Sequence, residues 1–286
     1  STAVHSNAFN FLGALQNGVD PRTGQYTITV TLPELKTYYL NGPTLPLAIA
    51  FSPLSRIDRG FGYGWNLQLT EYDVTTQIIS LHTGETYKVE GWDPETARAI
   101  IPEQRLDTFH LYDQGNNTYR LMHVSGEMEI LVNQGTLAVP EEYYSPQGQK
   151  IILAYTDFNG YPLLASITDA NDLLVLSVTR ESGSSLIDIE LYPFSAEGGT
   201  PVARYSLELT GDESRVTQIH LPSDDKAKWE FTYKNVFEFL CIETVTSPAG
   251  SREEITYDVQ GHEHPDPGAQ PLPRVFKHVQ FPFFDQ

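Results

Sequence analysis

Two histidines close to the end of the sequence, His262 and His264, form the arrangement that comes nearest to a set of metal ligands. Imidazoles at positions i and i+2 of an extended segment can reach one ion, and Asp266 follows them closely. Further ligands cannot be named, and the segment is rich in proline, which predicts a semi-rigid connector. We therefore predict no metal site and no cofactor.

Side chains that could serve as a nucleophile or as an acid–base pair lie in predicted turns or on strand faces. Ser125-Gly126 and Ser182-Gly183-Ser184 are typical of hairpin turns, and the sequence has no Gly-x-Ser-x-Gly segment. Glu127 and Glu129 share one face of a predicted strand, and alternate acidic residues are typical of an edge or a solvent-exposed face. We predict that the chain is not an enzyme.

Glycines alternate with aromatic residues in the segment Gly60-Phe61-Gly62-Tyr63-Gly64-Trp65-Asn66. The spacing differs from the Gly-x-Gly-x-x-Gly phosphate-binding loop, and a strand is predicted where such a loop should open a helix. Glycines between rings are instead typical of a place where backbone passes close to other parts of the chain. We predict that Gly62 and Gly64 allow a tight turn into a strand that begins at Trp65, and that Trp65 is buried.

The composition is strongly acidic, with 18 Lys and Arg against 37 Asp and Glu, a formal charge of −19 and a pI near 4.7. Such a chain repels nucleic-acid phosphates and anionic lipids, so we predict neither nucleic-acid nor membrane partners. The single cysteine, Cys241, lies among apolar residues and is predicted to be a buried hydrophobic side chain. Residues 1–7 lack the pattern of a signal peptide, and no segment approaches transmembrane length.

Apolar and polar residues alternate with a period of two along most of the sequence, and turn formers separate the alternating stretches. The alternation is cleanest over 25–32, and further predicted strands include 47–51, 65–70, 118–123, 150–155 and 186–191. A turn is predicted over 17–24 and a surface excursion over 91–104, in which 95–101 could form a short helix. We predict an all-β fold in two parts. A β-rich region with the glycine–tryptophan motif covers 1–145, and a strip of degenerate hairpins that ends in a proline-rich connector covers 146–286.

Tyrosines recur at the ends of predicted strands. Tyr233 and Tyr257 lie in the similar four-residue segments 231–234 (FTYK) and 255–258 (ITYD), and they are 24 positions apart. Tyr205 precedes Tyr233 by 28 positions, and Tyr155 also lies at the end of a predicted strand. An imperfect repeat of this length indicates hairpins that bury their apolar faces against one another. It favours an extended antiparallel sheet of successive β-hairpins over a compact sandwich.

Four stretches, in this order along the chain, resemble the Rhs or YD-repeat proteins of bacteria, including the C components of insecticidal toxin complexes. They are residues 17–26, 60–67 and 81–89, and the final stretch from Gly261 through the Leu-Pro-x-Val segment at 272–275 to His278. The residues that carry the match and serve as structural motif are Gly60, Phe61, Gly62, Gly64, Trp65, Asn66, Thr83, Gly84, Glu85, Tyr257, Asp258, Gly261, His262 and Pro265.

The resemblance implies the N-terminal portion of a larger protein in which a curved YD-repeat shell encloses a C-terminal toxin. Its partners would be the remainder of its own chain and the enclosed toxin, together with a delivery component or chaperone. It would lie in the bacterial cytoplasm before export and be secreted without a cleaved signal peptide, for attack on other bacteria or on a host. No counterpart of the family's self-cleaving aspartates is found, so no catalytic residues are carried over.

The aromatic residues, 12% of the chain, leave a second interpretation open. Tyr, Trp and Phe side chains can line a sugar-binding face, and a carbohydrate-binding β-protein is the alternative to the shell segment. Because most of these residues alternate with polar ones, we expect most of them in the core.

Overall fold

The computed structural model describes residues 15–20, 23–33, 45–192, 201–211, 214–223, 225–258 and 271–282. These residues form β-strands β1 to β23 and no helix, which confirms the predicted all-β fold. Accordingly, the described part of the chain holds no helix of the length and apolarity needed to cross a membrane.

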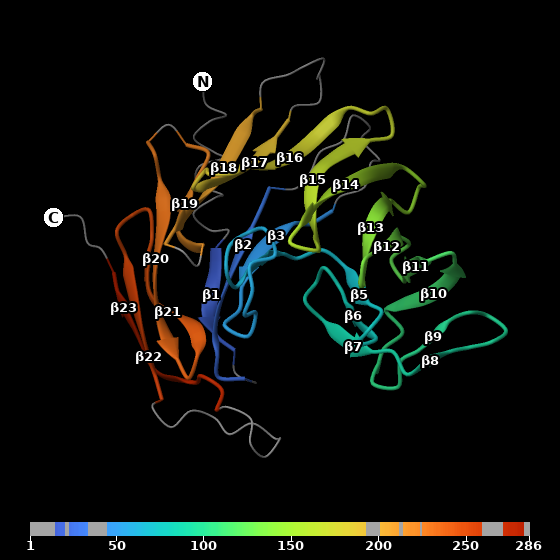
Figure 1. The fold of residues 1–286 in the computed structure, drawn as a ribbon, viewed down its shortest axis with the longest axis horizontal. Helices are drawn as coiled ribbons and strands as arrows, with labels where there is room; N and C mark the ends of the chain where they lie inside the picture. Colours follow the sequence, from blue (N-terminus) through green and yellow to red (C-terminus); the bar gives the residue numbers. More distant parts are fainter. Residues whose placement is uncertain are drawn as a thin grey trace.

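Most of the strands belong to one curved antiparallel sheet of 17 strands (Figure 1). From β10 to β23 each strand pairs with the next one along the chain, so this part is a continuous meander of hairpins. The bounds are β10 Phe109–Gly115, β11 Thr118–His123, β12 Met128–Gln134, β13 Leu137–Tyr144, β14 Lys150–Phe158, β15 Tyr161–Asp169, β16 Leu174–Arg180, β17 Leu186–Leu191, β18 Ala203–Thr210, β19 Arg215–His220, β20 Lys228–Val236, β21 Phe239–Thr246, β22 Arg252–Tyr257 and β23 Val275–Phe281. The extended sheet that the tyrosine repeat favoured is therefore confirmed.

Three short strands branch from this meander. β5 (Glu71–Asp73) pairs with β13, and β6 (Ile78–Ser80) and β7 (Thr86–Lys88) follow it as a further antiparallel ribbon. We name β5, β6 and β7 the side ribbon. A separate pair, β8 (Gly91–Trp92) and β9 (Ala99–Ile100), lies next in the chain.

The prediction of a short helix over 95–101 is wrong. The Asp93 carboxylate accepts the backbone N–H groups of Glu95 and Thr96, at 2.8 and 3.1 Å, and Ala97 adopts a positive φ of 60°. An aspartate that captures the following N–H groups favours a turn over a helix, and the chain then enters β9.

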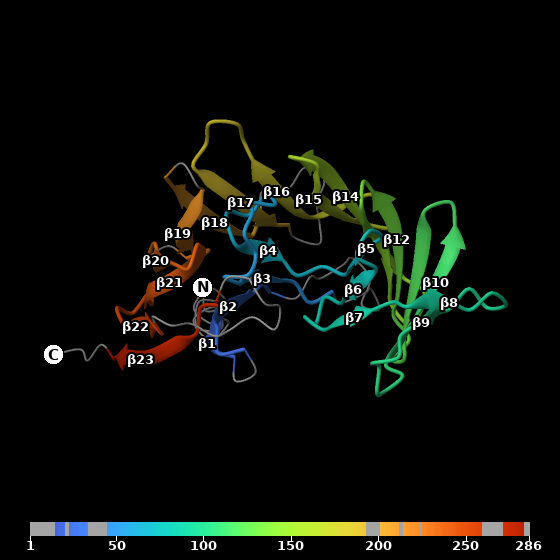
Figure 2. The same ribbon diagram turned by 60° about the horizontal axis from the view of Figure 1, so that its bottom comes forward.

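The first strands form a small antiparallel sheet in the order β1 (Leu15–Val19), β2 (Tyr26–Thr31), β3 (Ala48–Phe51) and β4 (Trp65–Leu67). Figures 1 and 2 show this N-terminal sheet inside the curve of the large sheet. The prediction of a turn over 17–24 is wrong at its start, because 17–19 pair with β2. The turn itself is closed by Gly24 N–H, which donates to Asp20 O at 2.8 Å.

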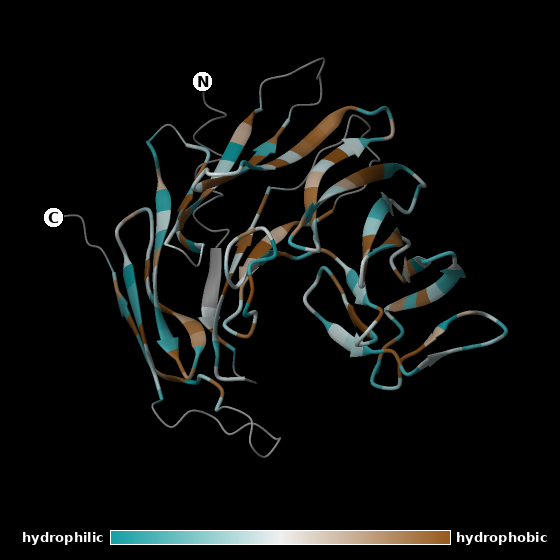
Figure 3. Cartoon of the chain, in the orientation of Figure 1, coloured by the Kyte–Doolittle hydropathy of each residue, from teal (hydrophilic) through white to brown (hydrophobic). Residues whose placement is uncertain are grey.

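The alternation of side chains explains how the two sheets meet. Tyr26, Ile28 and Val30 of β2 are buried while the residues between them are not, and hydrophobic and hydrophilic positions alternate along many strands in Figure 3. A large core cluster contains buried residues of β2, β3 and β4 together with residues from β13 to β22. A smaller cluster, which includes Tyr72, Phe109 and Leu121, lies between the side ribbon and the first strands of the meander.

Candidate functional site

Gly60, Gly62 and Gly64 lie where the N-terminal sheet meets the meander. Their φ angles are +121°, +93° and +82°, a region that disfavours any side chain. A Cβ on Gly62 would lie 2.6 Å from Val216 Cγ2, and one on Gly60 would lie 2.5 Å from Leu163 Cδ1. The backbone therefore approaches β15 and β19 too closely for any residue but glycine, as the sequence predicted for this segment. The predicted turn into β4 is closed by Trp65 N–H, which donates to Gly62 O at 3.1 Å.

Asp58 holds this glycine loop in shape and joins it to the large sheet. Its Oδ1 accepts the N–H groups of Gly60 and Gly62 at 2.8 and 3.0 Å. The Arg180 guanidinium at the end of β16 donates to both carboxylate oxygens, at 3.1 and 2.9 Å, in a fork geometry. No signal in the sequence connects Asp58 with Arg180, because they are 122 positions apart.

Trp65 is fully buried and begins β4, as predicted. Its ring packs against Phe51 and Phe231, with centroid distances of 5.6 and 5.3 Å, and its indole N–H donates to the Tyr233 hydroxyl at 2.9 Å. Asn66 next to it pairs with Ala50 in the ladder between β3 and β4. Trp65 thus connects the N-terminal sheet to β20 by packing and by a hydrogen bond.

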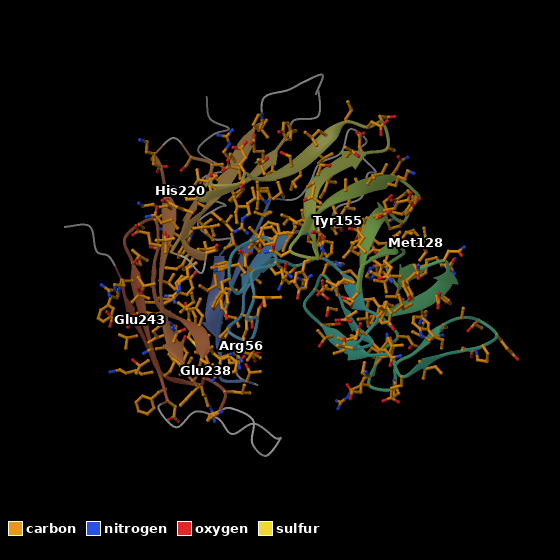
Figure 4. The ribbon with its side chains drawn as sticks, in the orientation of Figure 1. Arg56, Met128, Tyr155, His220, Glu238 and Glu243 are labelled. Atoms are coloured by element: carbon orange, nitrogen blue, oxygen red, sulfur yellow. The ribbon has the colours of Figure 1, made fainter. Side chains whose placement is uncertain are left out.

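A surface ion pair also connects the segment before the glycine loop to the large sheet. Arg56 lies near the turn between β20 and β21 (Figure 4), with Nη2 3.8 Å from Glu238 Oε2 and the guanidinium 4.9 Å from the ring centre of Phe239. Both charged side chains are exposed, so the ion pair contributes little to stability.

The repeating tyrosines have a common geometry in three of the four cases. Tyr155, Tyr233 and Tyr257, which we name the bulge tyrosines, each follow a register shift between their own strand and the next one. Each hydroxyl donates to a backbone carbonyl of the preceding strand, on Pro140, Val216 and Ile242 respectively. The bulge geometry explains why tyrosine recurs at these positions. Each bulge turns the tyrosine ring toward the preceding strand, where the hydroxyl can reach a backbone carbonyl.

The structure describes some of the remaining motif residues and leaves others outside the described ranges. Thr83, Gly84 and Glu85 form the exposed turn between β6 and β7, where Leu81 N–H donates to Glu85 O at 2.8 Å. Asp258 N–H donates to Arg274 O, also at 2.8 Å. The predicted motif positions Gly261, His262 and Pro265, and the considered metal ligands His264 and Asp266, lie outside the described residues.

His82, which precedes that exposed turn, belongs to a buried polar cluster that the sequence did not reveal. Its Nδ1 lies 3.9 Å from Glu129 Oε2, and His123 Nε2 lies 2.7 Å from the same oxygen. Thr70 completes the cluster, because its hydroxyl donates to Glu129 Oε2 at 3.1 Å and accepts the His82 backbone N–H at 3.3 Å. Glu129 is 1% exposed, so the prediction that it lies on an edge or a solvent face is wrong.

The reason for that error is the side ribbon. Glu129 lies on the hairpin of β11 and β12, and the ribbon that branches from β13 brings Thr70 and His82 over that face. Burial lowers the pKa of His82, and the neighbouring Glu129 carboxylate opposes this effect. Two imidazoles and a carboxylate that meet in this way can hold a proton or a cation.

Cys241 and the tryptophans lie largely in the core. Cys241 is fully buried, as predicted, and burial raises the pKa of its thiol to about 12, which keeps it protonated. Trp65 and Trp229 are buried, whereas Trp92 is half-buried against Tyr72 and Tyr119. Trp65 and Trp229 therefore cannot form an exposed sugar platform.

Comparison with known proteins gives a likeness of fold. No protein-family model matches the chain, and no curated protein matches it. Among solved structures, the Photorhabdus luminescens Tc holotoxin pore with the TccC3-D651A mutation aligns with a TM-score of 0.50 at 10% identity, over 95% of this chain and 20% of that one. The chain has the fold of part of a Tc toxin chain.

A second Tc toxin structure, TcdB2-TccC3-Cdc42, also gives a TM-score of 0.50 and 10% identity, over 90% of this chain and 19% of that one. The N-terminal domain of the effector protein SpvB from Salmonella typhimurium strain LT2 gives a TM-score of 0.37 and 13% identity, over 89% of this chain and 99% of that one. This chain therefore spans about a fifth of the length of the Tc toxin chains. The likeness to toxin-complex proteins that the motifs indicated is confirmed as a likeness of fold.

Proposed function

We propose that this chain is a non-enzymatic wall segment of an Rhs-type β-shell that encloses a C-terminal toxin. The observation that carries the proposal is the match of 95% of the chain to one fifth of a Tc toxin chain with a TM-score of 0.50. The four ordered motifs support it independently of the fold.

The shape of the large sheet is consistent with a wall. A meander of consecutive hairpins grows in one direction, and its curvature allows further hairpins to continue around an interior. Among the described strands, β23 has a residue register with β22 only, and it carries the exposed Phe276 and Phe281. A following hairpin would pair with the backbone of this strand and cover its two exposed rings.

The N-terminal sheet would act as a brace inside that wall. The glycine loop, the Asp58–Arg180 pair and Trp65 fix it to strands from β15 to β20, and Tyr26 OH donates to Glu253 of β22 at 2.6 Å. These contacts would hold the curvature of the sheet because they connect strands that are not neighbours in the meander.

The partners under this proposal are the rest of the same chain, the enclosed toxin and a delivery component or chaperone, with no role for nucleic acid or membrane. The protein would reside in the bacterial cytoplasm before export and leave the cell without cleavage of a signal peptide. Residues 1–145 would supply the brace and the first strands of the wall, and residues 146–286 would continue the wall.

The test is to express the natural protein with whatever residues follow Gln286 and to digest it with a protease. We expect the segment beyond the β-repeats to resist digestion in the whole protein and to be cleaved rapidly when it is expressed alone. Electron microscopy of the whole protein should show a hollow particle. Equal digestion of the segment in both settings, or a solid particle, would contradict the proposal.

Two assays on the 286-residue chain separate the shell from the other classes. Titration with oligosaccharides should give no saturable binding, and hydrolase substrates should give no turnover above buffer. Saturable sugar binding would favour the carbohydrate-binding alternative, and a rate that one carboxylate substitution abolishes would favour an enzyme.

A further inference from the structure

We propose that His82, His123 and Glu129 form a binding site for one zinc ion. Two imidazole nitrogens and one carboxylate oxygen are a ligand set that zinc uses in proteins, with a fourth position left to water or another oxygen. The three ligand atoms lie within 4.8 Å of one another. This site is independent of the shell proposal and would exist in the isolated chain.

The backbone positions all three ligands without strain in the sheet. His123 ends β11 and Glu129 lies in β12, where Glu129 pairs with Leu121, so both side chains project from the same face of one hairpin. His82 comes from the side ribbon, and the hydrogen bond from its N–H to Thr70 Oγ1 fixes its backbone over that face.

Movements of the three side chains can bring their ligand atoms to the spacing that tetrahedral coordination of zinc requires. Ligand atoms about 2.0 to 2.1 Å from a zinc ion lie roughly 3.3 Å apart in a tetrahedron. Glu129 Oε2 now lies 2.7 Å from His123 Nε2 and 3.9 Å from His82 Nδ1, so one distance has to open and the other to close by about 0.6 Å each. The third distance, between the two imidazole nitrogens, is at most 4.8 Å and has to close by up to about 1.5 Å. Rotation of the two imidazole rings can supply such changes.

The His82 ring packs edge-on against His123 and Tyr143, but its Nδ1 has no short hydrogen bond to the carboxylate beside it. The Glu129 carboxylate already has short partners in His123 and Thr70. His82 Nδ1 lies 3.9 Å from the same oxygen and 3.5 Å from Thr70 Oγ1, and neither distance is that of a good hydrogen bond. A cation between the three groups would satisfy the second imidazole and neutralise the buried carboxylate together.

Burial strengthens the attraction of the site for a cation and still leaves the site accessible. The Glu129 side chain is 1% exposed, whereas those of His82 and His123 are 11% and 14% exposed. An ion can enter at the imidazole edges, and a partly dehydrated carboxylate attracts it more strongly than a surface carboxylate does. Thr70 would orient the ligand carboxylate through its hydroxyl, as a second layer of hydrogen bonds commonly does at metal sites.

The experiment uses the untagged 286-residue chain, treated with a chelator and then exchanged into zinc-containing buffer. After gel filtration, mass spectrometry of the metal should find one zinc per chain. With cobalt in place of zinc, the visible spectrum should show the absorption of tetrahedral coordination. We expect His82→Gln and Glu129→Gln to hold zinc at least tenfold more weakly and to retain less than one zinc per chain after gel filtration.

Two control variants locate the site. His220→Gln alters a half-buried histidine that lies 2.9 Å from Glu208 and belongs to no cluster of three metal-ligating side chains among the described residues, and it should leave zinc binding unchanged. The double variant His262→Gln/His264→Gln should also retain one zinc, because it removes only the histidines that the sequence suggested.

His82→Gln decides the proposal even if Glu129→Gln does not fold, because it leaves the bond between His123 and Glu129 in place. Circular dichroism would verify that each variant is folded. Less than stoichiometric zinc in the parent chain, or stoichiometric zinc in folded His82→Gln, would overturn the proposal and leave a hydrogen-bonded cluster only.

Discussion

Gly62 and Gly84 have the same φ of +93° but lie in opposite surroundings. A Cβ on Gly62 would meet Val216, Leu209 and the carbonyl of Ser214, whereas one on Gly84 would have nothing within 4 Å. Substituting each glycine by alanine therefore separates two losses of stability, one from the strained backbone conformation and one from the close packing around the added methyl group.

We predict that Gly84→Ala lowers the free energy of unfolding by about 1 kcal/mol, since only backbone strain is added. Gly62→Ala should lower it by about 3 kcal/mol or more, because the added methyl group also overpacks the junction. Urea denaturation followed by circular dichroism measures both changes. Equal decreases in the free energy of unfolding of the two variants would show that the residues around Gly62 can move to accommodate a side chain.

Trp65 gives the second prediction at this scale. Trp65→Ala should destabilise the chain by roughly 3 to 5 kcal/mol, because it opens a cavity against Phe51 and Phe231 and removes the indole hydrogen bond to Tyr233. Phe276→Ala, at a ring that is 73% exposed, should change stability by no more than about 0.5 kcal/mol. Denaturation midpoints compare the two, and a neutral Trp65→Ala would refute its structural role.

At the scale of elements, the bulge tyrosines show how a weak repeat organises the sheet. Each bulge interrupts the ladder to the following strand, and the displaced tyrosine then bonds to the preceding strand. One side chain thus connects three strands of the meander. Burial raises the pKa of all three hydroxyls, so they remain donors.

We predict that Tyr257→Phe lowers stability by about 1 to 2 kcal/mol, because the buried carbonyl of Ile242 loses its hydrogen bond from the hydroxyl. Tyr87→Phe is the matched control, since the Tyr87 hydroxyl bonds to Glu85 at an exposed position. Chemical denaturation of both variants measures the difference. Similar values would mean that water replaces the lost donor at Ile242.

Local patterns allowed the strands to be predicted better than the contacts between them. The strands 118–123 and 186–191 were predicted with the bounds that the structure has. β13 was missed because buried residues run consecutively over 137–140 and end in a proline, which hides the alternation. The partner of Asp58 and the burial of Glu129 depend on segments far away in the sequence, so no local pattern could predict either.

For the whole molecule, the buried tyrosines predict a loss of stability in alkali. Burial raises the pKa of Tyr72 to about 12 and raises the pKa values of Tyr205 and Tyr257 as well, whereas an unfolded tyrosine titrates near 10. Above about pH 10 the unfolded state therefore loses protons that the folded state keeps. The free energy of unfolding falls as pH rises, by up to about 1.4 kcal/mol per pH unit for each such tyrosine.

Urea midpoints between about pH 8 and pH 11 measure this dependence. The variant Tyr72→Phe, which removes one of the buried hydroxyls, should flatten it. A midpoint that stays constant or rises through this range would contradict the burial of these side chains.

The N-terminal sheet has a further consequence, for the order in which the chain can fold. Its bonds from Trp65 to Tyr233 and from Tyr26 to Glu253 span 168 and 227 positions, whereas the hairpins of the meander join neighbours in the sequence. Contacts between distant residues form late, because closing a long loop costs entropy. During synthesis the first strands leave the ribosome with their apolar face uncovered and wait for strands made much later. The N-terminal sheet is therefore made before most of the meander but completed after it, and we expect its apolar face to be prone to aggregation during that interval.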